Sequence, residues 1–230
     1  MSPKIVQVFV NFGIGFELQI KNPNKKGIMI VKKHILRSII TLSVFTIISA
    51  FTHGTKDYSI ENTTFQSGEK LTYRLHYGLF TGAYPVMQTS SKISSINGKP
   101  HYKIDISGKT VGAFNKLFKV KDVWRSYVDT ATMLPSYAYR QISEGNYKLK
   151  EDTYINTGSG KIKIVKERKG EKQTKNYDAP EGIHDIVSGF YYFRNIDYRN
   201  KKIGDKVTVK SFFEDELYEL AVVYKGTETI

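Results

Sequence analysis

Apolar and polar residues alternate along most of the chain from about residue 58 onward. In "KLTYRLHYGLF" (70–80), every second residue from Leu71 to Tyr77 is apolar or aromatic, and the residues between them are polar. Successive side chains of a β-strand point to opposite faces, so this pattern is typical of strands with one buried face. It predicts antiparallel strands, separated by glycine-containing turns, over residues 70–80, 101–111, 160–168, 205–214 and 217–226.

Two segments instead have the three- and four-residue apolar spacing of helices. One is "VGAFNKLFKV" (111–120), and the other is "EGIHDIVSGFYYFRNI" (181–196), which follows a proline and carries acids near its start. The buried face expected for the second helix consists of Ile183, Ile186, Val187, Phe190, Tyr191 and Phe193. We therefore expect an all-β, antiparallel fold, either barrel-like or a strongly curved sheet, with one or two short helices packed on it. Residues 58–230 would form a single β-rich domain.

The segment 29–54 has the layout of a secretory signal peptide. Its basic start is followed by an uncharged apolar run from Ser38 to Phe51 and then by small residues. The run is shorter than the ~20 residues of a membrane-spanning helix, although a retained anchor is an alternative. Because a signal peptide normally begins at its own methionine, we expect Met29 to be the natural start and residues 1–28 to be a non-native extension. The alternative for residues 1–28 is a short apolar strand.

The net charge of +13 does not indicate a nucleic-acid groove. Seven of the 35 basic residues, but only one of the 22 acidic residues, lie in residues 1–54. The other lysines are spread along predicted strands between acids, which is typical of a solvated surface. The chain also lacks cysteine, which excludes disulfides, thiolate metal sites and a lipid-anchoring cysteine. We expect no nucleic-acid partner, and membrane contact only through an uncleaved signal peptide.

Four segments resemble an exported bacterial family with a domain of unknown function. They are "FQSGEKLTYRLHYGLFTGAY" (65–84), "YVDTATMLPSYAYRQISEGNYK" (127–148), "DIVSGFYYFRN" (185–195) and "GDKVTVKSFFEDELYELAVVYKGTETI" (204–230). The resemblance implies an all-β, YmcC-like barrel in the cell envelope of Gram-negative bacteria, and further strands after residue 230. It implies no activity and no site residues.

A hydrolase with a catalytic triad would need a serine, a histidine and an aspartate whose side chains converge. These three residue types occur together in "HDIVS" (184–188). On one helix His184 and Ser188 are neighbours, whereas Asp185 points about 100° away from them. No G-x-S-x-G motif is present. We therefore expect Asp185 to interact with the helix N-terminus and Ser188 with a nearby carbonyl. A polymer hydrolase would instead need clustered carboxylates such as Glu144, Glu151 and Asp152 in one cleft.

Cofactor and metal motifs are equally weak. His76, His101 and His184 are isolated from one another in the sequence, without metal-ligand spacing. The segment "NTGSGK" (156–161) lacks the spacing of a phosphate-binding loop and is better explained as a hairpin turn. We expect no cofactor, no metal and no catalytic residue.

One segment, "KVKDVWRSYVD" (119–129), is a candidate for ligand binding. Trp124, Arg125 and Tyr127 have the aromatic and cationic side chains that stack on a sugar or another ligand. On a strand, however, Trp124 lies on one face and the other two residues on the opposite face. The alternative for Trp124 is a place in the core.

The sequence thus predicts a non-enzymatic exported protein of the periplasm or outer membrane, with a binding or assembly role. Its expected partner is an envelope lipid, glycan or protein. A periplasmic carrier for a lipid or polysaccharide is the alternative, which a large apolar cavity would favour. An envelope-polymer hydrolase is a second, weaker alternative.

Overall fold

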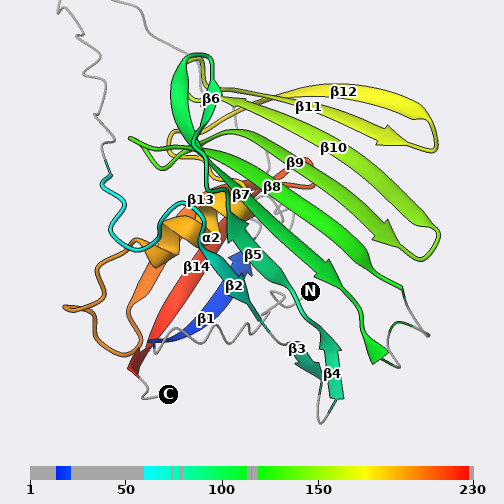
Figure 1. Ribbon diagram of the computed structural model, residues 1–230. Helices are drawn as coiled ribbons and strands as arrows, with labels where there is room; N and C mark the ends of the chain where they lie inside the picture. Colours follow the sequence, from blue (N-terminus) through cyan, green and yellow to red (C-terminus); the bar gives the residue numbers. More distant parts are fainter. Residues whose placement is uncertain are drawn as a thin grey trace, which may run out of the picture.

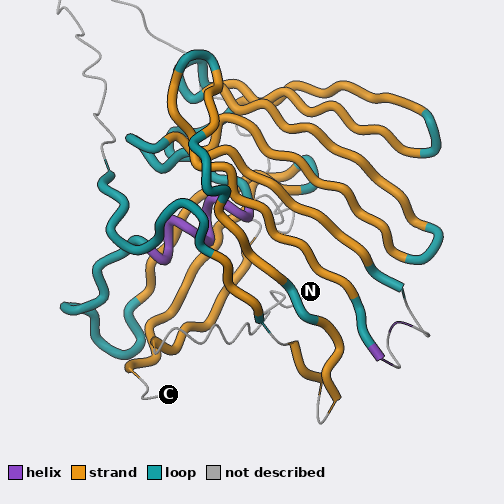
Figure 2. Tube along the Cα trace, in the orientation of Figure 1, coloured by secondary structure: helices purple, strands orange, loops and turns teal. Residues whose placement is uncertain are grey.

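The computed structural model describes residues 14–21, 60–73, 75–77, 80–112, 115 and 119–227 (Figure 1). Strands predominate and pair antiparallel, and α2 (Ile186–Arg194) is the main helix of this part of the chain (Figure 2). The all-β prediction with a short helix is therefore confirmed. The strands of the large sheet are, in spatial order, β12 (Glu171–Asp178), β11 (Lys161–Arg168), β10 (Tyr147–Asn156), β9 (Pro135–Glu144), β8 (Lys121–Asp129), β7 (Lys99–Lys109), β5 (Val86–Thr89) and β2 (Lys70–Thr72), with β6 (Ser94–Ile96) also on β7.

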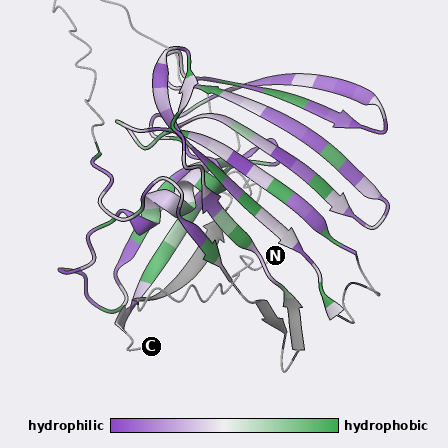
Figure 3. Ribbon diagram, viewed as in Figure 1, coloured by the Kyte–Doolittle hydropathy of each residue, from purple (hydrophilic) through white to green (hydrophobic). Residues whose placement is uncertain are grey.

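The large sheet is open rather than closed into a barrel. Its outer strands are β12 and β2, and no ladder joins them among the described residues. Of the two predicted architectures, the closed barrel is therefore not the one observed in the described part of the chain. Figure 3 shows hydrophobic and hydrophilic bands alternating along the long strands, as the period-two pattern predicts.

A second, three-stranded sheet contains β1 (Ile14–Lys21), β14 (Glu216–Thr227) and β13 (Lys206–Phe213). Helix α2 contacts β7 and β8 of the large sheet on one side and β13 on the other (Figure 1). We call the face of the large sheet toward α2 its inner face and the opposite face its outer face.

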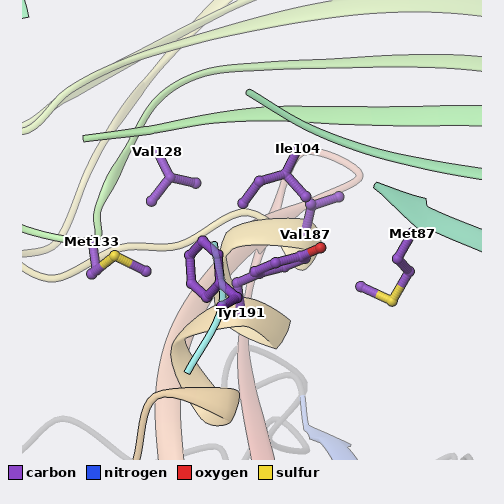
Figure 4. Packing of buried hydrophobic residues seen from close by; sticks show 7 residues of the cluster. Met87, Ile104, Val128, Met133, Val187 and Tyr191 are labelled. Atoms are coloured by element: carbon purple, nitrogen blue, oxygen red, sulfur yellow. The ribbon is translucent and has the colours of Figure 1, made fainter. Parts of the chain in front are cut away.

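Helix α2 fills the space between the two sheets. Val187 and Tyr191 pack against Ile104, Val128 and neighbouring apolar side chains of the large sheet (Figure 4). Phe193 joins a second cluster with residues of β13 and β14. This arrangement confirms that "GFYYFR" belongs to the core, although Phe190 is only half-buried.

Charged residues near the end of α2 form ion pairs. Arg194 makes a two-pronged ion pair with Glu69, with nitrogen–oxygen distances of 2.7 and 2.8 Å. Arg199 pairs with Asp197 in an exposed contact at 2.8 Å. Both arginines therefore cover carboxylates.

The helix begins later than the sequence predicts. Gly182 has a left-handed backbone (φ +70°), and the His184 N–H donates to Lys210 O at 2.9 Å. His184 thus bridges to β13 in extended conformation. The helix begins only after Asp185, because the backbone N–H and C=O of His184 both bond to β13, a neighbouring strand, rather than along the chain.

The predicted strand over residues 70–80 is also divided. β2 pairs with β5 in the large sheet, whereas β3 (Leu75–Tyr77) pairs with β4 (Phe80–Ala83) in a separate hairpin. The alternation continues through both pieces, so it carried no sign of the change of partner. Of the predicted helix over 111–120, the Asn115 N–H donates to Val111 O, but much of the segment lies outside the described residues.

The N-terminal predictions remain predictions. The signal segment 29–54 lies outside the described residues. Within residues 1–28, the backbone of β1 pairs antiparallel with β14, as the strand alternative describes. No helix in the described part of the chain is long and apolar enough to span a membrane.

Candidate functional site

The three candidate ligand residues of β8 divide between the two faces of the large sheet. Trp124 lies on the inner face, with its ring 5.5 Å from that of Phe213. Arg125 pairs with Asp105, and the Tyr127 ring lies 5.5 Å from that of Tyr137, both on the outer face. The structure therefore brings Arg125 and Tyr127 to one surface and assigns Trp124 to the core.

Three tyrosines form a continuous row across this outer face. Tyr127, Tyr137 and Tyr154 are cross-strand partners on β8, β9 and β10. The ring centroids of Tyr127 and Tyr137 are 5.5 Å apart, and those of Tyr137 and Tyr154 are 5.2 Å apart. In the same register, Lys103 of β7 and Lys163 of β11 lie at the two ends. We call Tyr127, Tyr137 and Tyr154 the tyrosine row; at strand spacing it spans about 10 Å.

Hydrogen-bonding groups border the tyrosine row on one side. The Tyr137 hydroxyl donates to Asp152, and burial together with this carboxylate raises the pKa of the Tyr137 phenol. The phenol therefore stays protonated as a donor. Arg125 also lies over the Tyr139 ring at 5.9 Å. The outer face thus combines exposed ring surface with fixed polar groups, a combination suited to binding a ligand that is apolar and hydroxylated at once.

The sequence alone did not identify Tyr137, Tyr139 or Tyr154 as part of this surface. The alternation in "SYAYRQ" (136–141) places the first two on one face of a strand. The alignment of Tyr137 with Tyr127 and Tyr154 depends on the pairing of three strands, which the alternation does not specify.

His184, Asp185 and Ser188 are buried and engaged in supporting the start of α2. Asp185 accepts from the backbone N–H groups of Val187 and Ser188 at 2.8 and 3.1 Å, and from Ser126 Oγ at 2.6 Å. Ser188 Oγ donates to Asp185 O at 3.2 Å and lies 3.2 Å from His184 Nδ1. Asp185 is therefore the N-cap of α2, and the predicted structural roles of Asp185 and Ser188 are confirmed.

Burial dominates the titration of this cluster. It lowers the pKa of His184 from 6.5 to about 4, so the imidazole is neutral near pH 7. Burial also raises the pKa of Asp185, against the opposing effect of its hydrogen bonds. With the hydroxyl, imidazole and carboxylate all inside the core, the cluster has no room for a substrate.

The other candidate groups do not converge either. Glu151 lies on the inner face with Arg140, whereas its neighbour Asp152 lies on the outer face with Tyr137. Glu144 lies near Asp122, and burial followed by the Asp122 charge raises the pKa of Glu144. The carboxylates Glu144, Glu151 and Asp152 therefore do not share one cleft.

No group of three or more potential metal ligands exists among the described residues. His101 is buried, with its ring nitrogens near Lys99 O and Ser136 Oγ, and the side chain of His76 lies outside the description. Residues 157–160 form the turn between β10 and β11, as expected of a hairpin.

A small void lies between the inner face and α2. It has a volume of about 30 Å³ and is lined by residues that include Trp124, Ile186 and Phe213. This volume holds about two water molecules and no lipid chain.

A comparison with family models finds one match. The family described as "Protein of unknown function (DUF3108)" matches residues 72–230, a segment that includes the tyrosine row and α2. No curated protein and no solved structure matches the chain.

Proposed function

The chain belongs to the DUF3108 family of proteins of unknown function, and we propose that it is a polysaccharide-binding protein of the cell envelope in Gram-negative bacteria. In this proposal the protein is exported, lies in the periplasm or at the outer membrane, and catalyses no reaction. The signal layout of residues 29–54 supports export. The tyrosine row is the observation that carries the binding role.

The chemistry of the row suits a sugar chain better than a lipid. Tyrosine rings pack against the C–H faces of sugar units, while hydroxyl and charged groups bind sugar hydroxyls. Tyr154 is 48% exposed, so its ring is available to a ligand. Arg125, Asp105 and Asp152 provide donors and acceptors beside the rings.

A lipid carrier is the second candidate, and the void beside Trp124 counts against it. A lipid-binding pocket is typically several hundred Å³ and mostly apolar. The void between the large sheet and α2 has only about 30 Å³. Native mass spectrometry of protein purified from its own envelope would favour the carrier if a lipid, rather than a saccharide, remained bound.

The binding test compares tyrosines on opposite faces of one strand. Tyr154 and Tyr147 both belong to β10, with exposures of 48% and 40%, but Tyr147 lies on the inner side. We expect the double variant Tyr137→Ala/Tyr154→Ala to bind envelope polysaccharide at least about tenfold more weakly in calorimetric titration. Tyr147→Ala should bind like the wild type. Equal losses in both variants, or no polysaccharide binding by the wild type, would overturn the proposal.

Export is tested separately. Cell fractionation should place the protein in the envelope, and its mature N-terminus should follow the signal segment 29–54. Recovery of peptides from residues 1–28 in the mature protein would contradict both the start at Met29 and the cleavage.

A further inference from the structure

A groove lies on the inner face of the large sheet, on the opposite side of the sheet from the tyrosine row. Figure 1 shows the hairpins β9–β10 and β11–β12 projecting beyond α2. The groove lies between these hairpins and the β13–β14 turn and has a volume of about 580 Å³. Five cationic and three carboxylate side chains line it: Arg140, Lys166, Arg168, Lys169, Lys175, Glu171, Glu214 and Asp215.

The floor of this groove is a closed network of ion pairs. Arg140 donates to Glu151 through two bonds of 2.8 and 2.9 Å. Lys166 bridges Glu151 and Asp215 at 3.3 and 2.8 Å, and Lys175 reaches Asp215 at 2.9 Å. Arg140 also lies 3.6 Å from Glu214, so three cations balance three carboxylates and the floor is close to neutral. These pairs attach the β13–β14 turn to the large sheet. They hold the groove in shape, since each buried charge has a partner.

The rim differs from the floor. Within the described residues no ion pair joins Arg168 or Lys169 to a carboxylate, although Glu171, the cross-strand partner of Arg168, also lines the groove. The Arg168 guanidinium instead lies over the ring of Tyr147, 4.7 Å from its centroid. This stacking restricts the guanidinium to the mouth of the groove without using its N–H donors, because the contact is with the ring face.

The turn that carries Lys169 has an unusual residue choice. Lys169 and Gly170 both have positive φ angles, of 52° and 81°, which is the geometry of a two-residue hairpin turn that favours Asn-Gly. A lysine in the left-handed region costs conformational free energy that an asparagine would largely avoid. This turn places a second cation beside Arg168 at the groove.

We propose that Arg168 and Lys169 form an anion site at the mouth of this groove, and that its ligand is a phosphate ester. A guanidinium binds two oxygens of a phosphate at once, and an adjacent ammonium adds a point charge. The phosphate belongs either to a phosphorylated saccharide or to a lipid headgroup. The site is on the opposite face from the tyrosine row and does not depend on the polysaccharide role.

Two soluble probes and one membrane probe distinguish the sources. The full chain is titrated with inorganic phosphate and with glucose 6-phosphate, and its sedimentation is measured with vesicles containing phosphatidylglycerol. Binding of glucose 6-phosphate without vesicle binding identifies the saccharide, and vesicle binding that Arg168→Ala/Lys169→Asn abolishes identifies the headgroup. Vesicle binding that this variant retains belongs to the apolar segment 38–51 and counts against the headgroup. Absence of saturable binding to all three probes would overturn the site.

The decisive variants remove the rim cations without disturbing the floor. Arg168→Ala/Lys169→Asn should weaken binding of the phosphate probe at least about tenfold. Lys169→Asn relieves the turn, and an unchanged unfolding midpoint of the double variant excludes loss of folding as the cause. The matched control is Lys150→Ala/Lys172→Ala, which removes the same charge from the outer face.

If the control variant lost as much affinity for the phosphate probe as the rim variant, net charge alone would explain the binding, and the proposal would be overturned. The variants Tyr137→Ala and Tyr154→Ala should retain phosphate binding, while Arg168→Ala/Lys169→Asn should retain binding of a neutral polysaccharide. Failure of the phosphate site and failure of the polysaccharide role are therefore separate results.

Discussion

The two faces of the large sheet use the same strands for different purposes, and β10 shows the contrast. Leu149, Glu151 and Ile155 point to the inner face and are buried, whereas Tyr154, between Glu151 and Ile155 on the chain, is 48% exposed on the outer face. Polar groups on the inner face are held in pairs, as Glu151 is by Arg140 and Lys166. The outer face instead presents a row of aromatic rings. Stability thus depends mainly on one face, and binding to a polysaccharide can depend on the other.

The strongest test of this contrast removes the ring at the centre of the inner core. Tyr191 is fully buried, and its ring packs 4.8 Å from that of Phe65. We expect Tyr191→Ala to lower the free energy of unfolding by about 4 kcal/mol, because the sheets cannot close around the cavity. Chemical denaturation measures it. The half-buried neighbour Phe190 is the control: Phe190→Ala should lose about half as much, and an equal loss would mean that α2 does not pack as described.

Breaking the buried ion pair comes next in size. Arg140→Met leaves Glu151 in the core with Lys166 alone, so we expect a loss of about 3 kcal/mol in unfolding free energy. The double variant Arg140→Met/Glu151→Leu should recover most of it, because no charge is then buried unpaired. Arg199→Ala, which breaks an exposed pair, should leave stability within measurement error. A double variant as unstable as the single one would argue against the pairing.

The buried imidazole predicts a smaller, pH-dependent effect. Burial holds the pKa of His184 at about 4, below its ordinary value of 6.5. As the pH falls from 6.5, the unfolded chain takes up a proton that the folded protein excludes, so stability decreases. The loss is about 1.4 kcal/mol per pH unit, or roughly 2 kcal/mol by pH 5. The raised pKa of Asp185 gives the opposite slope, since its proton favours the folded state.

Comparison of His184→Gln with the wild type isolates the contribution of the imidazole to the pH dependence of stability. His184→Gln cannot titrate, so its unfolding free energy should fall less than that of the wild type between pH 6.5 and about pH 5. Parallel curves for the two proteins would show that His184 is accessible to protons in the folded state.

Only a small effect on stability is expected on the outer face. Tyr154→Ala removes an exposed ring that contacts Tyr137 at 5.2 Å and Lys163 at 6.0 Å. We expect a loss below about 1 kcal/mol in thermal and chemical unfolding. A loss as large as that of Tyr191→Ala would mean that the outer face is also core, and the contrast between the faces would fail.

Much of the fold follows from local pattern. The alternation predicted β7, β11, β13 and β14 close to their observed bounds, and the apolar spacing of residues 186–193 predicted a core helix. The start of α2 was placed too early because the backbone of His184 bonds to β13, a partner more than 25 residues away. Likewise, no local signal separates β2 from β3, since the difference lies in which strand each one pairs with.

The candidate sites show the same division. By itself, the sequence determined which side chains of each strand share a face, because side-chain direction alternates with every residue. It therefore separated Trp124 from Arg125 and Tyr127. Only the tertiary structure decided which residues of different strands meet, because register depends on pairing across the sheet. That pairing aligned Tyr127 with Tyr137 and Tyr154, and it placed the rim cations opposite the β13–β14 turn.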